Sequence, residues 1–135
     1  MELTNNSTVD IILNRREIMD SQFGDALRNY RRAANISQRQ LAQRIGVDFS
    51  YISKIENGKL PPPAADTIVD ICKVLNIPSE ELLALTGKLP TKIQENVSTR
   101  KAAQTFLREA QKMNLTDEEW DQITHSLKKL RDEDA

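Results

Sequence analysis

The sequence predicts an all-α protein, and three observations support this fold class. Apolar residues recur at the spacing of an amphipathic helix in several segments of the 135-residue chain. Two capping boxes, each a Ser or Thr followed three residues later by Gln or Glu, begin at Ser37 and Thr116. Residues 37–59 read as two short helices with Gly46 between them. We therefore expect a five-helix domain followed by a C-terminal extension of two helices.

The segment 37–59 gives the most detailed prediction. Ser37 and Gln40 can cap the first short helix, and Gly46 can adopt the left-handed conformation that ends it. Ala42 is small enough to let the two helices cross closely. The apolar positions that would join them are Leu41, Ile45, Ile52 and Ile55. This arrangement is a helix-turn-helix, and the alternative is an ordinary helical hairpin within an all-α protein.

The motif resembles the helix-turn-helix of the phage-repressor-like (Cro/CI, or XRE) family. The residues that carry the resemblance are, in order, Gln38, Ala42, Gly46, Ile52 and Ile55. The resemblance extends over residues 23–86, roughly half of the chain. It implies a lambda-repressor-like DNA-binding domain of five helices, in which the second helix of the motif enters the major groove.

The other helices of this domain are predicted from the same kinds of pattern. A first helix is expected over 23–34, an extended stretch at the prolines of 60–63, and a helix over 64–75. A fifth helix should open at Ser79 and end at 86–87. The arginines of the first helix that lie off its apolar stripe, and should face solvent or phosphate, are Arg28, Arg31 and Arg32.

The sequence divides into three parts. Residues 1–20 are polar and lack periodicity at their start, so we expect an N-terminal arm that is flexible. The helix-turn-helix domain should occupy 21–87. Residues 88–135 follow a Gly and Pro boundary and predict one helix over 99–113 and another from Thr116. Two helices are too few for a core of their own, so this region must pack on another surface.

Composition limits the classes of function. Apolar residues make up 39% of the chain and charged residues 29%, and no apolar run approaches the roughly 20 residues that span a bilayer. With one cysteine and no secretory signal pattern, a cytoplasmic protein is expected. The net charge is −1, but residues 23–60 hold seven basic and three acidic side chains, a net charge of +4. The positive charge is therefore concentrated where a helix-turn-helix would meet phosphates.

No pattern in the sequence indicates catalysis or a cofactor. The motifs of zinc proteases, nucleotide-binding loops and serine hydrolases do not occur. One histidine and one cysteine cannot form the usual structural zinc site. We therefore expect neither an enzyme nor a metal or cofactor site.

The expected DNA contacts follow from the resemblance and from side-chain chemistry. Ser50, Ser53 and Lys54 would reach base edges, Phe49 a thymine methyl group, and Gln38 a backbone phosphate. The full set of expected DNA-binding residues is Gln38, Arg39, Asp48, Phe49, Ser50, Tyr51, Ser53, Lys54, Asn57 and Lys59. The preferred partner is double-stranded DNA.

The C-terminal helices are the expected dimerisation region, because one such domain contacts too few base pairs for specificity in a genome. The residues expected at the interface are Phe106, Leu107, Trp120, Ile123, Leu127 and Leu130. The sequence thus predicts a homodimeric regulator, more often a repressor, on a palindrome with half-sites about 34 Å apart. Two alternatives remain: an antitoxin that also regulates its own operon, and a mobile-element repressor controlled by a protease.

Overall fold

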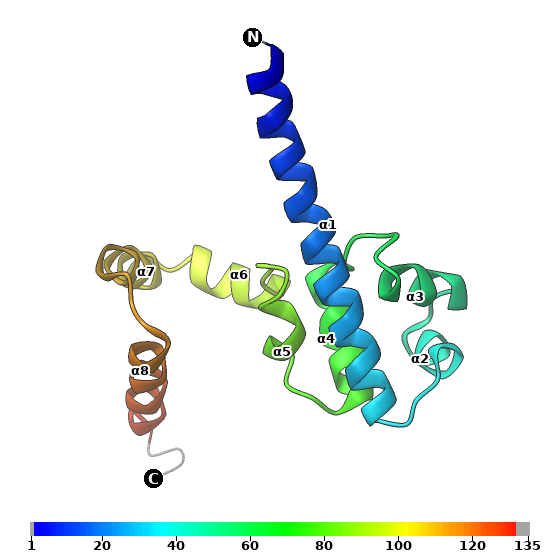
Figure 1. Cartoon of the computed structure of the whole chain (residues 1–135). Coiled ribbons are helices and arrows are strands. Elements are labelled where there is room, and N and C mark those ends of the chain that lie inside the picture. The colour runs from blue at the N-terminus through cyan, green and yellow to red at the C-terminus, as the bar shows by residue number, and fades with distance from the viewer. Residues whose placement is uncertain (1, 132–135) are drawn as a thin grey trace. The chain divides into compact units, whose positions relative to one another are not determined.

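The computed structural model describes the backbone of residues 2–131 and the side chains of residues 14–131, and that part of the chain is helical with no strand. The all-α prediction is confirmed. Figure 1 shows the helices in chain order. They are α1 (Glu2–Ala33), α2 (Gln38–Ile45), α3 (Phe49–Glu56), α4 (Ala65–Leu75), α5 (Glu80–Leu83), α6 (Thr91–Ser98), α7 (Lys101–Met113) and α8 (Asp117–Lys129).

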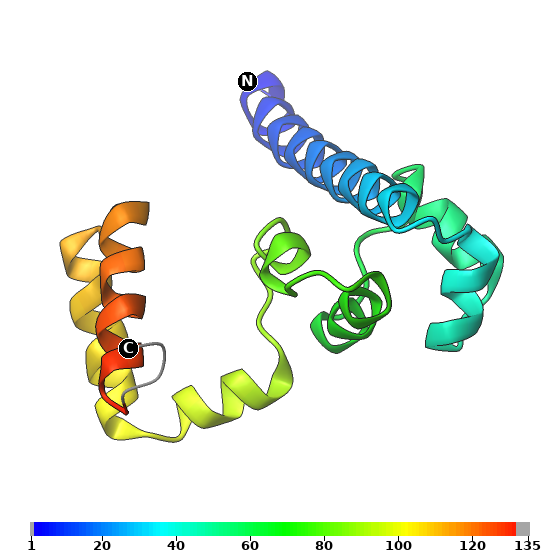
Figure 2. The same ribbon diagram turned by 90° about the horizontal axis from the view of Figure 1, so that it is seen from below.

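The chain divides into two compact units, Met1–Thr91 and Lys92–Ala135. The first unit contains α1 to α5. In Figures 1 and 2 the C-terminal half of α1 lies among the other helices of this unit, while its N-terminal half extends past them. The second unit contains most of α6 and all of α7 and α8.

The first unit has a continuous apolar core. α1 contributes the fully buried Phe23 and Leu27 on the predicted stripe. The helices α2 to α5 supply the remaining buried residues, which are Leu41, Ala42, Ile52, Ile55, Ile68, Ile71, Cys72, Leu75, Leu82 and Leu83. Burial raises the pKa of the Cys72 thiol to about 11, in accord with a packing role for this side chain. This core fixes α2 and α3 relative to α1.

Helix α1 includes residues 2–20, which belong to the segment for which the sequence predicted a flexible arm. It begins at Glu2 rather than at Phe23 and continues to Ala33. The physical reason is that no Pro or Gly interrupts the chain between Glu2 and Phe23. Once residues from Phe23 onward are held in the core, each added residue extends an existing helix, which is much easier than starting one.

Helix α6 was not predicted, so the C-terminal extension has three helices instead of two. The sequence placed a helix start at Ser98, whereas Ser98 ends α6 and α7 begins at Lys101. At the start of α6 the Asp66 carboxylate accepts hydrogen bonds from the Thr91 amide (3.0 Å) and hydroxyl (2.8 Å). No residue of α6 is buried, and its apolar residues are only Ile93 and Val97, too few for the repeated stripe by which a helix is recognised.

The second unit buries little of its own apolar surface. Figure 2 shows α8 turning back along α7, and the predicted capping box of Thr116 and Glu119 is present at the start of α8. Among the described residues of this unit, Ala110 is the one apolar residue that is buried. The large apolar side chains that stay exposed on α7 and α8 or at their ends are Phe106, Leu107, Met113, Trp120, Leu127 and Leu130.

Over the described part of the chain, no helix combines the length and the apolar character that a membrane span requires.

Candidate nucleic-acid interface

The turn between α2 and α3 has the local geometry that the sequence predicted. The Ser37 hydroxyl accepts a hydrogen bond from the Gln40 amide (3.1 Å), and the Gln40 side chain accepts one from the Ser37 amide (2.8 Å). Gly46 ends α2 with φ of 76°, a left-handed conformation in which a Cβ atom would be strained. Asp48 stands at the N-cap of α3, although its side chain makes no capping hydrogen bond. Two short helices are thus set at a fixed crossing.

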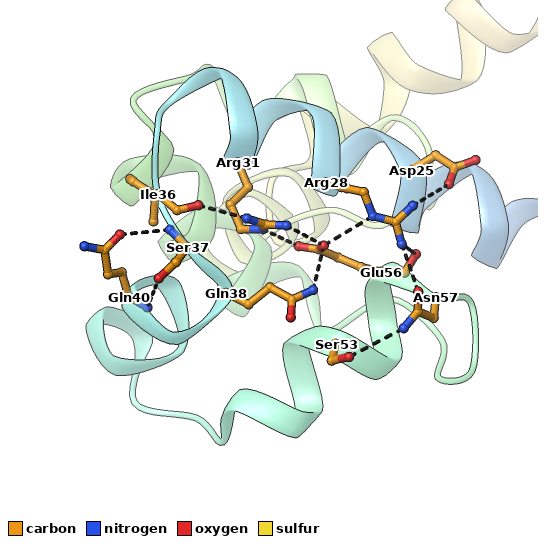
Figure 3. Close-up of polar contacts among 10 residues, drawn as sticks. All are labelled: Asp25, Arg28, Arg31, Ile36, Ser37, Gln38, Gln40, Ser53, Glu56 and Asn57. Atoms are coloured by element: carbon orange, nitrogen blue, oxygen red, sulfur yellow. Dashed lines mark hydrogen bonds and ion pairs between the residues drawn. The ribbon is translucent and has the colours of Figure 1, made fainter.

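A buried carboxylate, Glu56, joins α1, α2 and α3, as Figure 3 shows. Its two oxygens accept hydrogen bonds from Arg31 of α1 at 2.6 and 2.9 Å. One of these oxygens also accepts a hydrogen bond from the Gln38 amide group of α2 at 2.9 Å. Arg31 donates a further bond to the Ile36 carbonyl oxygen, in the loop before α2 (2.9 Å). The last residue of α3 is therefore attached to the beginning of α2 and to the end of α1.

The environment of Glu56 favours its charged form. Burial alone would raise the pKa of this carboxyl group, but the hydrogen bonds from Arg31 and Gln38 and the charges of Arg31 and Arg28 outweigh it. The pKa of Glu56 therefore lies below its ordinary value. The hydrogen bonds between Arg31 and Glu56 also raise the pKa of Arg31. Both groups stay ionised, so the pair remains charged at neutral pH.

Arg28, whose side chain is partly exposed, forms hydrogen bonds with the C-terminal end of α3. Its guanidinium donates to the Glu56 carbonyl oxygen and to the Asn57 side-chain oxygen, each at 2.9 Å. Gly24, one turn before Arg28, lets α1 approach this end of α3 closely. A Cβ atom on Gly24 would lie 2.6 Å from the carbonyl oxygens of Ile55 and Glu56. The end of α3 is thus packed and hydrogen-bonded, whereas its beginning faces solvent.

Comparisons with known proteins agree with this geometry. A family model described as Helix-turn-helix matches residues 27–82. The uncharacterised HTH-type transcriptional regulator RghRB of Bacillus subtilis is 42% identical over 78 residues, which cover 56% of this chain and 56% of that protein. The uncharacterised HTH-type transcriptional regulator MT0491 of Mycobacterium tuberculosis is 34% identical over 110 residues, which cover 82% of this chain and 77% of that protein. The chain belongs to the helix-turn-helix family of transcriptional regulators.

A third relative adds a function in its name. The HTH-type transcriptional repressor RghR of Bacillus subtilis is 40% identical over 65 residues, 48% of this chain and 48% of that protein. The chain thus spans about half the length of the two Bacillus relatives. All three relatives are named as transcriptional regulators, a class that is not enzymatic, and the helix-turn-helix is the DNA-binding part of such proteins.

The structure separates the predicted DNA-binding residues of the helix-turn-helix motif into two groups. The first group is tied to the protein itself: Gln38 to Glu56, and Asn57 to Arg28 and, at 3.5 Å, to the Ser53 hydroxyl. Tyr51 is half-buried and packs against the core. The second group is exposed and consists of Arg39, Asp48, Phe49, Ser50, Lys54 and Lys59. Contact with DNA remains a prediction for every residue in both groups.

Arg39 and Phe49 form an exposed pair across the motif. The guanidinium carbon of Arg39, the second residue of α2, lies 4.8 Å from the centre of the Phe49 ring, at the first residue of α3. That distance is within the range of a cation–π interaction. The Phe49 side chain is 42% exposed, so the pair lies at the surface at the N-terminal end of α3.

Sequence reasoning missed the buried ion pair of Arg31 and Glu56. The prediction that Arg31 faces solvent or phosphate is wrong, since its side chain is 10% exposed and bound to Glu56. One available signal is that each residue follows a core residue by one helical turn, Arg31 after Leu27 and Glu56 after Ile52. Nothing in the spacing along the chain indicates that the two side chains meet.

No group of three or more potential metal ligands occurs among the described residues.

Proposed function

We propose that this helix-turn-helix protein is a homodimeric repressor that binds a palindromic DNA operator in a sequence-specific manner. The observation that supports DNA reading most strongly is the contrast between the two ends of α3. Its last residue, Glu56, is 2% exposed and bound to α1 and α2, whereas its first residues, Phe49 and Ser50, are exposed. A helix held rigidly at one end presents the other end to the major groove without a large loss of conformational entropy.

The charge of this surface suits a polyanion. Arg28 and Arg31 are both engaged with Glu56, Arg31 beside the core and Arg28 nearer the surface, so neither is a residue that we expect to meet phosphates. Arg39, Lys54 and Lys59 are exposed on α2, on α3 and just after α3. Cations at these positions give the exposed side of α2 and α3 a positive charge, which favours the approach of DNA.

Dimerisation is supported by the apolar side chains of the second unit. Phe106, Trp120 and Leu127 are large and exposed, and adjacent exposed apolar side chains are typical of protein interfaces. A second copy of the same surface gives a symmetric contact and two reading helices, which together match a palindrome. Repression is the outcome we propose, because a relative is named a transcriptional repressor and because a bound promoter excludes polymerase.

Salt titration of DNA binding by the full chain tests this function. We expect the logarithm of the binding constant to fall linearly with the logarithm of salt concentration, by about 0.9 for each phosphate neutralised. Lys54→Ala should change the preferred sequence in a selection from randomised operators, by about 1–3 kcal/mol at one base pair of each half-site. Lys101→Ala, on exposed α7, is the control and should leave the preferred sequence unchanged. A binding constant that does not respond to salt would contradict DNA binding.

A further inference from the structure

Phe49 occupies a position where an aromatic side chain needs an explanation. It is the first residue of α3, and its ring is 42% exposed although the core of the same unit lies beneath α3. An exposed phenyl ring lacks the stabilisation that burial of its apolar surface would provide. It also has no group that could form a hydrogen bond in the polar groove that α3 is proposed to enter. The ring lies against the Arg39 guanidinium, whose central carbon is 4.8 Å from the ring centre.

The stack restricts Arg39 without using its hydrogen-bonding edge. A cation–π contact uses the charge of the guanidinium and none of its N–H hydrogen bonds, so these donors stay available to a ligand. An exposed arginine on a surface normally samples many rotamers, and holding it in one place reduces the entropy that binding would cost. Phe49 therefore favours one placement of the Arg39 donor group, at the N-terminal end of α3.

The orientation of α2 makes this position stable. Gln38, the neighbour of Arg39, donates a hydrogen bond to Glu56 at 2.9 Å, and Ser37 and Gln40 close the capping box on the other side. The backbone that carries Arg39 is thus fixed to the far end of α3, while the Arg39 side chain contacts the near end. Both ends of α3 are therefore connected to α2.

We propose that Arg39 reads a guanine of the operator and that Phe49 is the positioning residue that holds its guanidinium for this contact. This inference rests on the proposed function, since it requires that α3 enter the major groove of DNA. A planar fork of donors matches the O6 and N7 acceptors of guanine, and this pair is the commonest base-specific arginine contact. A phosphate contact would need only charge, and it would not require the ring.

Operators that contain 7-deazaguanine test the proposal. This base lacks the N7 acceptor, and it is placed at each guanine of a selected operator in turn. For the wild-type full chain we expect one guanine in each half-site whose replacement weakens binding about tenfold, as expected for the loss of a specific base contact. The quantity measured is the ratio of the affinities for the normal and the modified operator. A partly unfolded preparation lowers both affinities equally and leaves this ratio unchanged.

Three variants and one control distinguish a base-specific contact of Arg39 from general electrostatic attraction to DNA. Arg39→Gln and Phe49→Leu should bring the ratio at that guanine from about tenfold to less than about twofold, because the fork is removed or no longer held. Phe49→Tyr keeps an aromatic face and should retain the ratio. Arg44→Gln is the matched control, because it removes an exposed arginine from the last turn of α2, the helix that carries Arg39. This variant should also retain the ratio.

Two results would overturn the inference while leaving the proposed function intact. One is a sensitive guanine whose ratio stays near tenfold in Arg39→Gln, which would make Arg39 a phosphate contact. The other is an unchanged ratio in Phe49→Leu, which would leave the ring without a positioning role. If the wild-type chain instead prefers no DNA sequence over random DNA, the proposed function itself fails.

Discussion

The two compact units of the chain differ in how far they bury their large apolar side chains. In the first unit, α1 to α5 enclose a core of large side chains such as Phe23, Ile52 and Leu82, each completely buried. In the second unit, Trp120 is 41% exposed and Leu127 is 63% exposed, although both belong to the apolar line of α8. A similar helical periodicity in the sequence thus corresponds to burial in one region and to an open apolar surface in the other.

The difference teaches what each region needs in order to be stable. The first unit satisfies its own packing and even its buried charges, because Glu56 and Arg31 neutralise one another beside the core. The second unit has well-formed helices, with a capping box at Thr116, but it does not cover its apolar side chains. We therefore expect substitutions in the first unit to change its folding stability. Substitutions on the apolar surface of the second unit should change dimerisation.

The largest loss of folding free energy should follow Glu56→Gln. This change leaves the buried Arg31 guanidinium without its counter-charge, and breaking a buried ion pair costs about 3–5 kcal/mol. Urea unfolding measures the loss, and Glu80→Gln on the exposed side of α5 is the control. The double variant Arg31→Met with Glu56→Leu should recover much of the stability, since no unpaired charge remains. A single variant as stable as wild type would show that the first unit does not depend on this pair.

The next effect should appear in the second unit as dissociation. Trp120→Ala removes a large apolar side chain from the proposed subunit interface, at a cost of about 3 kcal/mol for a buried aromatic. Sedimentation at micromolar concentration should detect monomers, while the unfolding of the first unit stays as in wild type. His125→Ala, on the same helix and exposed off the apolar line, should remain dimeric. A monomeric wild type would remove the contrast between the two units.

A smaller loss should follow Gly24→Ala. The added methyl group would lie 2.6 Å from two carbonyl oxygens at the end of α3, so α1 and α3 must separate slightly. Overpacking of this kind costs about 1–3 kcal/mol. Asn29→Ala, at an exposed position of the same helix, is the control for the change in helix propensity. Equal melting temperatures for the two variants would mean that the helices tolerate the separation.

The smallest expected effect is a loss of folding stability at low pH. Because the pKa of Glu56 is lower in the folded protein, its stabilising contribution is complete above the unfolded value of about 4.3. The contribution is lost as the pH falls through the lower folded value. Urea midpoints measured from about pH 6 to pH 3 should therefore fall more steeply for wild type than for Glu56→Gln. Parallel curves would assign the acid sensitivity to other carboxyl groups.

Local signals in the sequence predicted the helix-turn-helix well. The Ser37 cap, the turn at Gly46 and the apolar positions Ile52 and Ile55 each depend on neighbours a few residues away, and all appear in the structure as expected. The ion pair between Arg31 and Glu56 joins residues 25 positions apart, so no local pattern contains it. The same holds for the stack of Arg39 on Phe49, which exists only because α2 and α3 cross.

The ends of helices were harder to predict for a different reason. The start of α1 at Glu2 depends on elongation from a packed segment, and elongation needs no apolar stripe. Helix α6 likewise buries no residue, and the hydrogen bonds of its first residue, Thr91, go to Asp66 of a distant helix. Periodicity identifies helices by what they bury, so it misses helices and helix ends that are exposed.

Footprinting of the full chain on a selected operator tests the central claim. The claim is that the first unit binds DNA and that two chains dimerise through the apolar surface of the second unit. The claim predicts two protected segments on one face of the duplex, with centres about 34 Å, or one helical turn, apart. In Trp120→Ala both segments should be protected only at higher protein concentration. A single protected segment, or two segments whose protection is unaffected by Trp120→Ala, would contradict the account.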